Sequence, residues 1–545
     1  MKMSLRWVRG LLAGLAGATS LLPAASASQE RCAALQTLAL ADAHVARVQH
    51  LAAGRFTPPQ GAAFNVDRPY CRVEIVATPT PASDIRIEVW LPDAAHWNGR
   101  FWGLGNGSFG GQIPHRSLAV RIAAGYAVVA TDSGHQADPS DSSWALGQPE
   151  KVVDYGHRSI HLAAVHGKQA AEAYFGRKPD RAYFSAYSNG GRQALMLAQR
   201  YPEDYDGIVA GAPAPDLTGI YVGVAEFLAQ MAAAPDARLS AAQADLLAAA
   251  VRASCDTQDG VRDGVLENPL RCRFDPAALA CAAQPGPVCL NPAQVAGVRR
   301  LYAGLPPPRG GASAGGMARG SEMRWHALLY GDKPGQAELH APVTGFFRHL
   351  VLDVPAWNLS QFRVGREAQR MQGRLVSTLD ATDPDLGRFV ARGGKLILWH
   401  GWNDAVVSPA YSVAFHASVV RTLGFQAAAR SVRLFMAPGV EHGIGGPGPD
   451  RFGQFSSGDG DPERSLGAAM RRWVERGVAP EQVIAVRYRN ANDPASGVVR
   501  SRPLCAWPKV AVYRGEGSTD DAQSFQCALQ AVAKPYERGR QKGSP

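Results

Sequence analysis

One segment constrains the fold of this chain more than any other, because it joins two strands through a helix within a short span. Residues 181–214 read RAYFSAYSNGGRQALMLAQRYPEDYDGIVAGAPA. A strand, a sharp turn at Ser188, a helix and another strand succeed one another here. This succession is a βαβ unit, in which the two strands run parallel. We therefore predict a chain of the α/β class, built around a parallel sheet.

Further strands are predicted on both sides of this unit. Over residues 85–135, apolar or β-branched runs alternate with turns in IRIEVWLP, RFWGLGNG and YAVVATDSGH, and a helical stretch, HRSIHLAAVHGKQAAEAYFG, follows. Strand signals resume in GGKLILWHGWND and SVRLFMAPGVEHG, with a helical segment, YSVAFHASVVRTLG, between them. We assign residues 28–216 and 384–530 to the two parts of one core.

The segment between these parts, residues 217–383, has a different pattern. It contains alanine-rich helices, an acidic loop that carries cysteine, and the Gly/Pro-rich stretch LPPPRGGASAGGMARGSE. We predict a domain inserted into the core.

The N-terminal segment of the chain predicts export. The start, MKMSLRWVRG, is basic, and it is followed by an apolar run and the small residues Ala25-Ser26-Ala27. This pattern is typical of a secretory signal peptide over residues 1–27, cut before Ser28, and it predicts a secreted or periplasmic protein. Residues 531–545 read as a disordered tail. No later apolar run is long enough to span a bilayer, so we expect no membrane anchoring.

The formal net charge of +10 is dispersed along the chain and forms no basic block. A nucleic-acid partner is therefore not expected. The sequence leaves the oligomeric state open.

An even set of eight cysteines in an exported chain predicts disulfides. Their distribution favours three close pairs, Cys255 with Cys272, Cys281 with Cys289, and Cys505 with Cys527, which leaves Cys32 with Cys71. The sequence alone permits other pairings. Zinc is the competing interpretation, but the chain has no C-x-x-C motif and the cysteines lie in separate regions.

Ser188 is the candidate nucleophile. It lies in Ala186-Tyr187-Ser188-Asn189-Gly190, at a strand-to-helix turn that would expose its hydroxyl. The motif departs from G-x-S-x-G at Ala186, where a small side chain can replace glycine, and alone it is a weak signal.

An acid and a histidine follow in the order that an α/β-hydrolase requires. Asp404 comes after the strand KLILWHG, and His442 comes after VRLFMAPG. His442 would take the proton of Ser188 and return it to the leaving alcohol, and Asp404 would orient the imidazole and stabilise its cation. Together the three residues predict a Ser-His-Asp triad that works through an acyl-enzyme.

Residues 103–111, GLGNGSFGG, follow an early strand at the place where such enzymes supply an oxyanion N–H. We expect Gly107 or Ser108 to donate here, and Asn189, next to the nucleophile, to supply the second N–H. A phosphate-binding loop is a rival interpretation, but G-x-x-x-x-G-K-[ST] is absent. A plain glycine turn is the other.

These residues resemble the tannase/feruloyl esterase family, which includes the bacterial mono(2-hydroxyethyl) terephthalate hydrolase. The match runs from about Cys32 to Cys527, and it is carried by WNGRFWGLGNGSFGG, TDSGH, SNGGRQAL, DYDGIVAGAPA, CDTQDGVRDGV, GGKLILWHGWND and His442. The resemblance implies an α/β-hydrolase core with an inserted lid domain, hydrolysis of aromatic acid esters, and a structural calcium ion. The eight cysteines match four bridges of the family by position.

The chain departs from the family at one bridge. In the family a cysteine before the serine is joined to a cysteine after the histidine, whereas these positions are Tyr187 and Gly443 here. Ser188 and His442 must then be held in register by packing alone.

The calcium ion implied by the resemblance would lie in the loop between Cys255 and Cys272. Hard oxygen donors suit calcium, and the loop differs from an EF-hand in its spacing. The ligands would be the side chains of Asp256, Asp259 and Asp263 with the carbonyls of Val261 and Val265.

The leading hypothesis is a secreted serine esterase that acts on small aromatic esters, either phenolic or hydroxycinnamic. A non-catalytic binding protein on a hydrolase fold, a serine hydrolase of non-aromatic esters and a serine peptidase are the alternatives. The lid should determine the acyl group, and four of its residues are candidates for the pocket, although packing or surface roles are favoured for each: Trp325, Trp357, Phe362 and Arg363.

Overall fold

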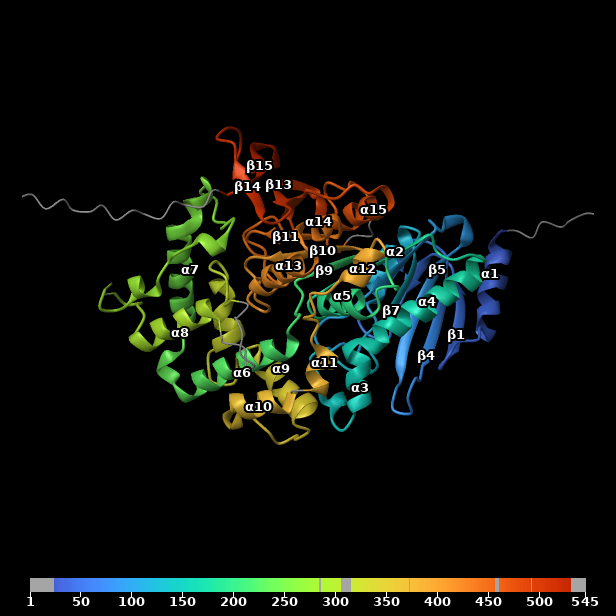
Figure 1. Ribbon diagram of the computed structural model, residues 1–545, viewed down its shortest axis with the longest axis horizontal. Coiled ribbons are helices and arrows are strands. Elements are labelled where there is room, and N and C mark those ends of the chain that lie inside the picture. The colour runs from blue at the N-terminus through green and yellow to red at the C-terminus, as the bar shows by residue number, and fades with distance from the viewer. Residues whose placement is uncertain are drawn as a thin grey trace, which may run out of the picture.

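A mixed sheet of nine strands runs through the described part of the chain (Figure 1). The computed structural model describes residues 24–283, 286–304, 315–371, 373–455, 460–491 and 493–530. Residues 1–23 of the predicted signal peptide and the predicted tail 531–545 lie outside them. In spatial order the strands are β1 (Ala43–Leu51), β4 (Tyr70–Ala77), β5 (Ile85–Pro92), β7 (Ala127–Thr131), β6 (Arg100–Leu104), β8 (Arg181–Tyr187), β9 (Gly207–Gly211), β10 (Lys395–Gly401) and β11 (Val432–Ala437).

The predicted parallel sheet is confirmed for the six strands from β7 to β11, which pair in parallel. The strands β1, β4 and β5 extend this sheet at one edge in antiparallel pairing. The parallel strands are buried on both faces, which explains their nearly continuous apolar sequences.

Helices cover both faces of the sheet. On one face α4 (Ser159–Phe175), α5 (Asn189–Arg200) and α13 (Ala410–Leu423) pack on the strands, and on the other α2 (His115–Ala123) and α15 (Leu466–Arg476) do so. Successive residues of a strand point to opposite faces. Phe184 of β8 accordingly joins the core beneath α4 and α5, whereas Tyr183 joins the core beneath α2 and α15.

The segment between β9 and β10 is mainly helical. The box motifs at Ser240 and Asn291 cap two of its helices, and Pro292 begins the second of them. Its helices include α6 (Leu217–Ala233), α7 (Ala241–Cys255), α8 (Pro292–Ala303), α9 (His340–Gly345), α10 (Val364–Met371) and α11 (Arg374–Leu379). We call residues 217–383 the lid. In Figure 1 α6, α7, α8 and α10 lie together at one end of the molecule, whereas α11 lies against the core.

Two hairpins near the C-terminus are additions that the sequence analysis does not foresee. They are β12 (Gln482–Asn490) with β13 (Asp493–Cys505), and β14 (Lys509–Tyr513) with β15 (Phe525–Leu529). A further short pair near the N-terminus, β2 (Gly54–Phe56) with β3 (Phe64–Val66), is also separate from the main sheet.

All eight cysteines are paired, and the predicted close pairs are confirmed. The bridges are Cys32–Cys71, Cys255–Cys272, Cys281–Cys289 and Cys505–Cys527.

No single helix among the described residues has the length and apolar composition needed to cross a bilayer. One pair of consecutive helical segments, Leu217–Ala233 and Pro235–Asp259, meets the length and composition criteria when the two are taken together. The two segments are bent by 117° relative to each other.

Candidate active site

Ser188 occupies the turn between β8 and α5, and its backbone is in an unusual conformation. Its φ is 63° and its ψ is −129°. Such a backbone costs a non-glycine residue about 1–3 kcal/mol and persists where the surrounding structure enforces it, often at active sites. A Cβ at Gly190 would lie 2.6 Å from the Cβ of Ala186, so this glycine and the small residue at 186 together let α5 begin close to β8.

Asp404 and His442 are brought together by the loops after β10 and β11. The Nδ1 atom of His442 lies 2.5 Å from Oδ2 of the fully buried Asp404. The other carboxylate oxygen of Asp404 accepts the backbone N–H groups of Val406, at 2.8 Å, and of Val407, at 2.9 Å. Asp404 is therefore fixed from both sides and can orient the imidazole of His442.

A second histidine, His400 of β10, completes this buried network. Its Nε2 atom lies 3.1 Å from Oδ2 of Asp404 and 3.0 Å from the carbonyl of Val407, and its Nδ1 atom lies 2.7 Å from Oγ of Ser412. Nε2–H can donate to Asp404 while Nδ1 accepts the hydroxyl of Ser412. His400 is predicted from the sequence only as part of the strand in KLILWHG, and its role in this network is not predicted.

The charges of this network shift two pKa values in opposite directions. Burial raises the pKa of the Asp404 carboxyl, but the charge of His442 and hydrogen bonds from His400 and His442 outweigh burial and hold the pKa well below its usual range. Burial lowers the pKa of His442, and the charge and hydrogen bond of Asp404 outweigh it, so the net shift is upward. The site therefore favours a negative Asp404 beside an imidazole that can readily take a proton.

Tyr187 and Gly443 bring the Ser188 turn next to the His442 loop. The ring centroids of Tyr187 and His442 are 5.8 Å apart. A Cβ on Gly443 would lie 2.9 Å from Cε2 of Tyr187, so the tyrosine ring rests on the glycine backbone. The predicted absence of a bridge at these positions is thus matched by an aromatic contact.

The three candidate oxyanion residues lie on two loops that one tyrosine connects. The hydroxyl of Tyr155 lies 2.9 Å from the carbonyl of Ser108 and 3.1 Å from Oδ1 of Asn189. The side chain of Asn189 also donates to the carbonyl of Asn106, at 3.3 Å. Among the residues that the structure describes, no acceptor is found for the backbone N–H of Ser108 or of Asn189. These two donors are available to a developing oxyanion, and Gly107 directly precedes Ser108 in the loop after β6.

The buried guanidinium of Arg192 holds the side chain of Asn189 in place. The guanidinium of Arg192, which is fully buried, donates from Nε to Oδ1 of Asn189 at 2.7 Å and from Nη1 to the carbonyls of Gly156, at 2.8 Å, and Leu379, at 3.0 Å. Neither Arg192 nor Tyr155 is among the residues predicted for the site from the sequence. The charge of Arg192 within the stretch GGRQALMLA is a signal that could have found the first, and Tyr155 gave none.

The predicted calcium loop is rich in oxygen, but its side chains mostly bond to the loop itself. Asp256 accepts the N–H of Gly264 at 3.0 Å, and Asp263 is paired with Arg502 of β13. Burial, with the charge of Asp263, raises the pKa of Asp259 to about 6. Within the described ranges, no three acidic, histidine or cysteine side chains are grouped as metal ligands. The oxygen atoms of this loop are ligands that suit calcium. The arrangement of its acidic side chains does not by itself define a calcium site.

The four lid residues considered for the pocket have packing or surface positions. Trp325, Trp357 and Phe362 are buried in the lid's apolar clusters, and Arg363 is exposed and donates to the carbonyls of Ser360 and Phe362. These positions agree with the roles that the sequence analysis favours.

Comparison with known proteins gives the family. The model of the family described as tannase and feruloyl esterase matches residues 71–528. An uncharacterized esterase of Xanthomonas campestris is 37% identical, over 96% of both chains, and a probable feruloyl esterase B-1 of Aspergillus flavus is 30% identical, over 85% of this chain and 87% of that protein.

Solved structures agree with the sequence comparisons. The crystal structure of feruloyl esterase B from Aspergillus oryzae has a TM-score of 0.84 at 26% identity and covers 92% of this chain and 100% of that chain. Tannin acyl hydrolase from Aspergillus niger, at 20% identity and a TM-score of 0.73 over 93% and 95% of the two chains, shows the same fold. The chain therefore belongs to the tannase and feruloyl esterase family, has the α/β-hydrolase fold, and is a carboxylic-ester hydrolase.

Proposed function

We propose that this chain is a secreted serine esterase in which Ser188, His442 and Asp404 hydrolyse small aromatic esters. The observation that carries the proposal is the 2.5 Å contact between Nδ1 of His442 and Oδ2 of the buried Asp404. The ring of Tyr187, next to the strained Ser188, packs near the ring of His442 and so holds the His442 loop against the Ser188 turn. A strained serine beside a histidine that an aspartate orients is the arrangement that acyl transfer requires.

The chemistry has two steps. Oγ of Ser188 attacks the ester carbonyl carbon while Nε2 of His442 takes its proton, and the carbonyl oxygen becomes negative against the N–H groups of Ser108 and Asn189. The tetrahedral intermediate then expels the alcohol, which takes the proton from His442, and leaves an acyl-enzyme. Water, deprotonated by His442, hydrolyses this ester and releases the acid and free Ser188.

Aromatic side chains support an aromatic acyl group. Phe109 follows the candidate donor Ser108 directly, and its ring centroid lies 6.0 Å from that of the half-buried Tyr221 in the lid. Tyr221 in turn stacks on Phe346 with centroids 4.0 Å apart. Phe109 and Phe346 are buried, so the partly exposed Tyr221 is the ring of this row that can stack on an aromatic acyl group. The names of the feruloyl esterase relatives point the same way.

A hydrolysis panel tests the proposal. Methyl ferulate, methyl gallate, mono(2-hydroxyethyl) terephthalate and a short-chain aliphatic ester would be compared, with a peptide anilide beside them. We expect the aromatic esters to have the highest kcat/KM and a fluorophosphonate to label the protein. Equal or faster turnover of the aliphatic ester would refute the aromatic preference, cleavage of the anilide alone would favour a peptidase, and a protein that neither turns over nor is labelled would be a binding protein.

Export and calcium are further parts of the proposal. Four disulfides are typical of proteins that fold in an oxidising compartment, which supports a secreted or periplasmic location. N-terminal sequencing of the exported protein should begin at Ser28. A calcium ion would be held by Asp256, Asp259 and Asp263 with the carbonyls of Val261 and Val265, and it would brace the loop rather than take part in the reaction.

A further inference from the structure

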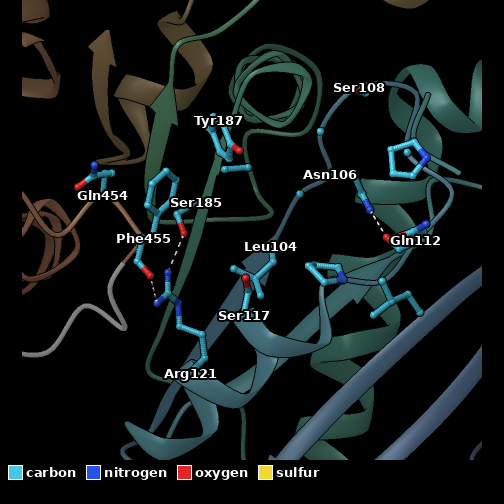
Figure 2. Close-up of a pocket in the computed structure, with 17 residues that line it drawn as sticks. Leu104, Asn106, Ser108, Gln112, Ser117, Arg121, Ser185, Tyr187, Gln454 and Phe455 are labelled. Carbon is cyan, nitrogen blue, oxygen red and sulfur yellow. Dashed lines mark hydrogen bonds between the residues drawn. The ribbon is translucent and has the colours of Figure 1, made fainter. Parts of the chain in front are cut away.

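Aromatic side chains of the core support the loop that carries His442. The ring of Tyr187 lies beside that of Phe455, with centroids 5.1 Å apart (Figure 2). The centroid of the Tyr187 ring is also 5.8 Å from that of His442. These contacts hold the His442 loop on the side of the serine turn. The loop that carries Asp404 is held by other contacts, and the first of them come from its neighbour, Asn403.

Asn403 directly precedes Asp404, is buried, and joins three parts of the chain. Its backbone N–H donates to the carbonyl of Val440, two residues before His442, at 2.9 Å. Its side-chain Nδ2 donates to the carbonyl of Gly320, in the lid, at 2.7 Å. Asn403 therefore fixes the Asp404 loop against the His442 loop and against the lid at once.

The lid segment 316–322 runs against the Asp404 loop. Gly320 has a φ of 102°, and a Cβ there would lie 3.3 Å from Oδ1 of Asn403, so a glycine lets the lid backbone approach the asparagine closely. Earlier in the segment, the carbonyl of Gly316 accepts the hydroxyl of Ser408 at 2.6 Å. These two hydrogen bonds tie the segment to the loop that follows β10.

A buried carboxylate fixes the position of Gly320. Glu322 is fully buried, and its Oε2 atom accepts the N–H of Gly320 at 2.8 Å. Its Oε1 atom accepts the hydroxyl of Tyr302, on α8, at 2.7 Å. The burial of a carboxyl group is costly unless the group is hydrogen-bonded. The bonds that offset this cost are the ones that hold the lid backbone where Asn403 reaches it.

We propose that Asn403 is a positioning residue for the triad, and that the lid sets its place through Gly320 and Glu322. Apart from the bond to Gly320, the side chain of Asn403 is not fixed, because its Oδ1 atom has no hydrogen-bond partner among the residues that the structure describes. Loss of the bond would let Asp404 move away from His442 and lengthen their 2.5 Å contact. This role rests on the proposed function and makes the lid a support of the triad.

The pH profile reports the contact, because Asp404 raises the pKa of His442. The other titratable and charged groups at the two loops are His400, which lies 3.1 Å from Asp404, Glu441, which precedes His442, and Arg324 of the lid. The charge of Arg324 acts on Glu441, whose pKa burial raises overall. The variants below keep all of these groups, so a shift of the midpoint reports the geometry of the Asp404–His442 pair.

Asn403→Ala removes the donor to the lid and keeps the backbone of the loop. Asn98→Ala is the matched control, because Asn98 makes the same two kinds of bond before β6, at the opposite end of the parallel strands. Its backbone N–H donates to the carbonyl of Gly125 at 2.9 Å, and its Nδ2 donates to the carbonyl of Ala124 at 2.9 Å. Glu322→Gln replaces one carboxylate oxygen with an amide at nearly equal volume and acts on the triad only through the lid.

We expect Asn403→Ala to lower kcat for methyl ferulate about tenfold, to leave KM within about twofold, and to shift the acid midpoint of kcat/KM downward. Glu322→Gln should act in the same direction by about threefold, and the double variant should be no slower than Asn403→Ala alone. Tyr302→Phe, which removes a partner of Glu322, takes its place if Glu322→Gln does not fold. Asn98→Ala should change none of these values.

The proton on Nδ1 of His442 gives a second readout, which requires no turnover. A proton in a short, charge-assisted hydrogen bond resonates far downfield. This resonance should be present in the parent and in Asn98→Ala, and it should move upfield or disappear in Asn403→Ala.

Three results would overturn the inference: a resonance and an acid midpoint that stay unchanged in Asn403→Ala, equal effects of Asn98→Ala, or effects of Asn403→Ala and Glu322→Gln that multiply in the double variant. A parent that hydrolyses no ester would instead refute the proposed function, and the resonance would still decide whether the lid positions Asp404.

Discussion

The hydroxyl of Tyr155 lies 3.1 Å from Oδ1 of Asn189 and thereby joins the two loops that carry the candidate oxyanion donors. The same hydroxyl is 2.9 Å from the carbonyl of Ser108. Tyr155 is buried in a π-helical turn, Asp154–Arg158, that leads into α4. Such turns often occur at functional sites. Its position fixes the separation of the Ser108 and Asn189 backbones, whose N–H groups are the proposed oxyanion donors.

The variant Tyr155→Phe should therefore lower kcat by about tenfold and leave KM nearly unchanged, because the donors act on the transition state more than on the bound ester. The free energy of unfolding should fall by about 1 kcal/mol for the lost hydrogen bonds. Steady-state kinetics and urea unfolding would measure both. Tyr330→Phe is the control, since the buried Tyr330 hydroxyl has no hydrogen-bond partner among the described residues. An unchanged kcat in Tyr155→Phe would contradict the positioning role.

The acid limb of the pH profile should report His442. The imidazole acts as a base only when neutral, and Asp404 raises its pKa above the ordinary value of 6.5. The kcat/KM for methyl ferulate should therefore fall as pH drops through a midpoint above 6.5. Asp404→Asn removes the charge and should lower kcat by about 10⁴-fold. A rate that stays constant down to pH 5 would rule out His442 as the base.

The sequence predicts much of this site because its residues follow strands with strong apolar signals. Ser188, Asp404 and His442 each follow a predicted strand, and the parallel order of β8, β10 and β11 brings their ends to one edge of the sheet. Tyr155 could not be predicted in this way, since its role depends on a distance between two loops.

The same limit applies to the edges of the fold. The alternating sequences of the C-terminal hairpins resemble ordinary surface segments, and nothing local reveals that β13 places Arg502 on Asp263. The cysteine pairs, by contrast, are close in sequence, and their predicted pairing agrees with the structure.

The contact between Tyr187 and Gly443 predicts a site for an engineered bridge. The double variant Tyr187→Cys with Gly443→Cys removes the ring that a Cβ at 443 would meet, so the two thiols should form a disulfide on oxidation. Gly443 has a φ of 93°, which disfavours cysteine, so the gain in stability should be less than the usual 2–4 kcal/mol or so. Thiol titration before and after oxidation gives the readout.

Gly443→Ala alone is the matched comparison for this pair. Its methyl group would meet the ring of Tyr187 at 2.9 Å in an unfavourable backbone conformation, so we expect a loss of both stability and activity. If the double cysteine variant keeps two free thiols after oxidation, the two loops are not in the register that the structure gives.

Calcium removal should destabilise the protein without stopping the reaction at once, because Asp256, Asp259 and Asp263 lie in the lid and the triad lies in the core. EDTA should lower Tm, and calcium should restore it by mass action. Asp259→Asn should lower the Tm in calcium and reduce the response to EDTA. Protein purified with calcium present that contains none by metal analysis would refute the proposed site.

The role of Ser188 is the centre of the account, and the kcat/KM of Ser188→Ala tests it most directly. Removal of a triad nucleophile should reduce kcat/KM for methyl ferulate by about 10⁴-fold or more. The Tm should stay nearly unchanged, because the half-buried hydroxyl of Ser188 contributes little packing. A folded Ser188→Ala protein that retains a substantial fraction of the parent's kcat/KM would contradict the account.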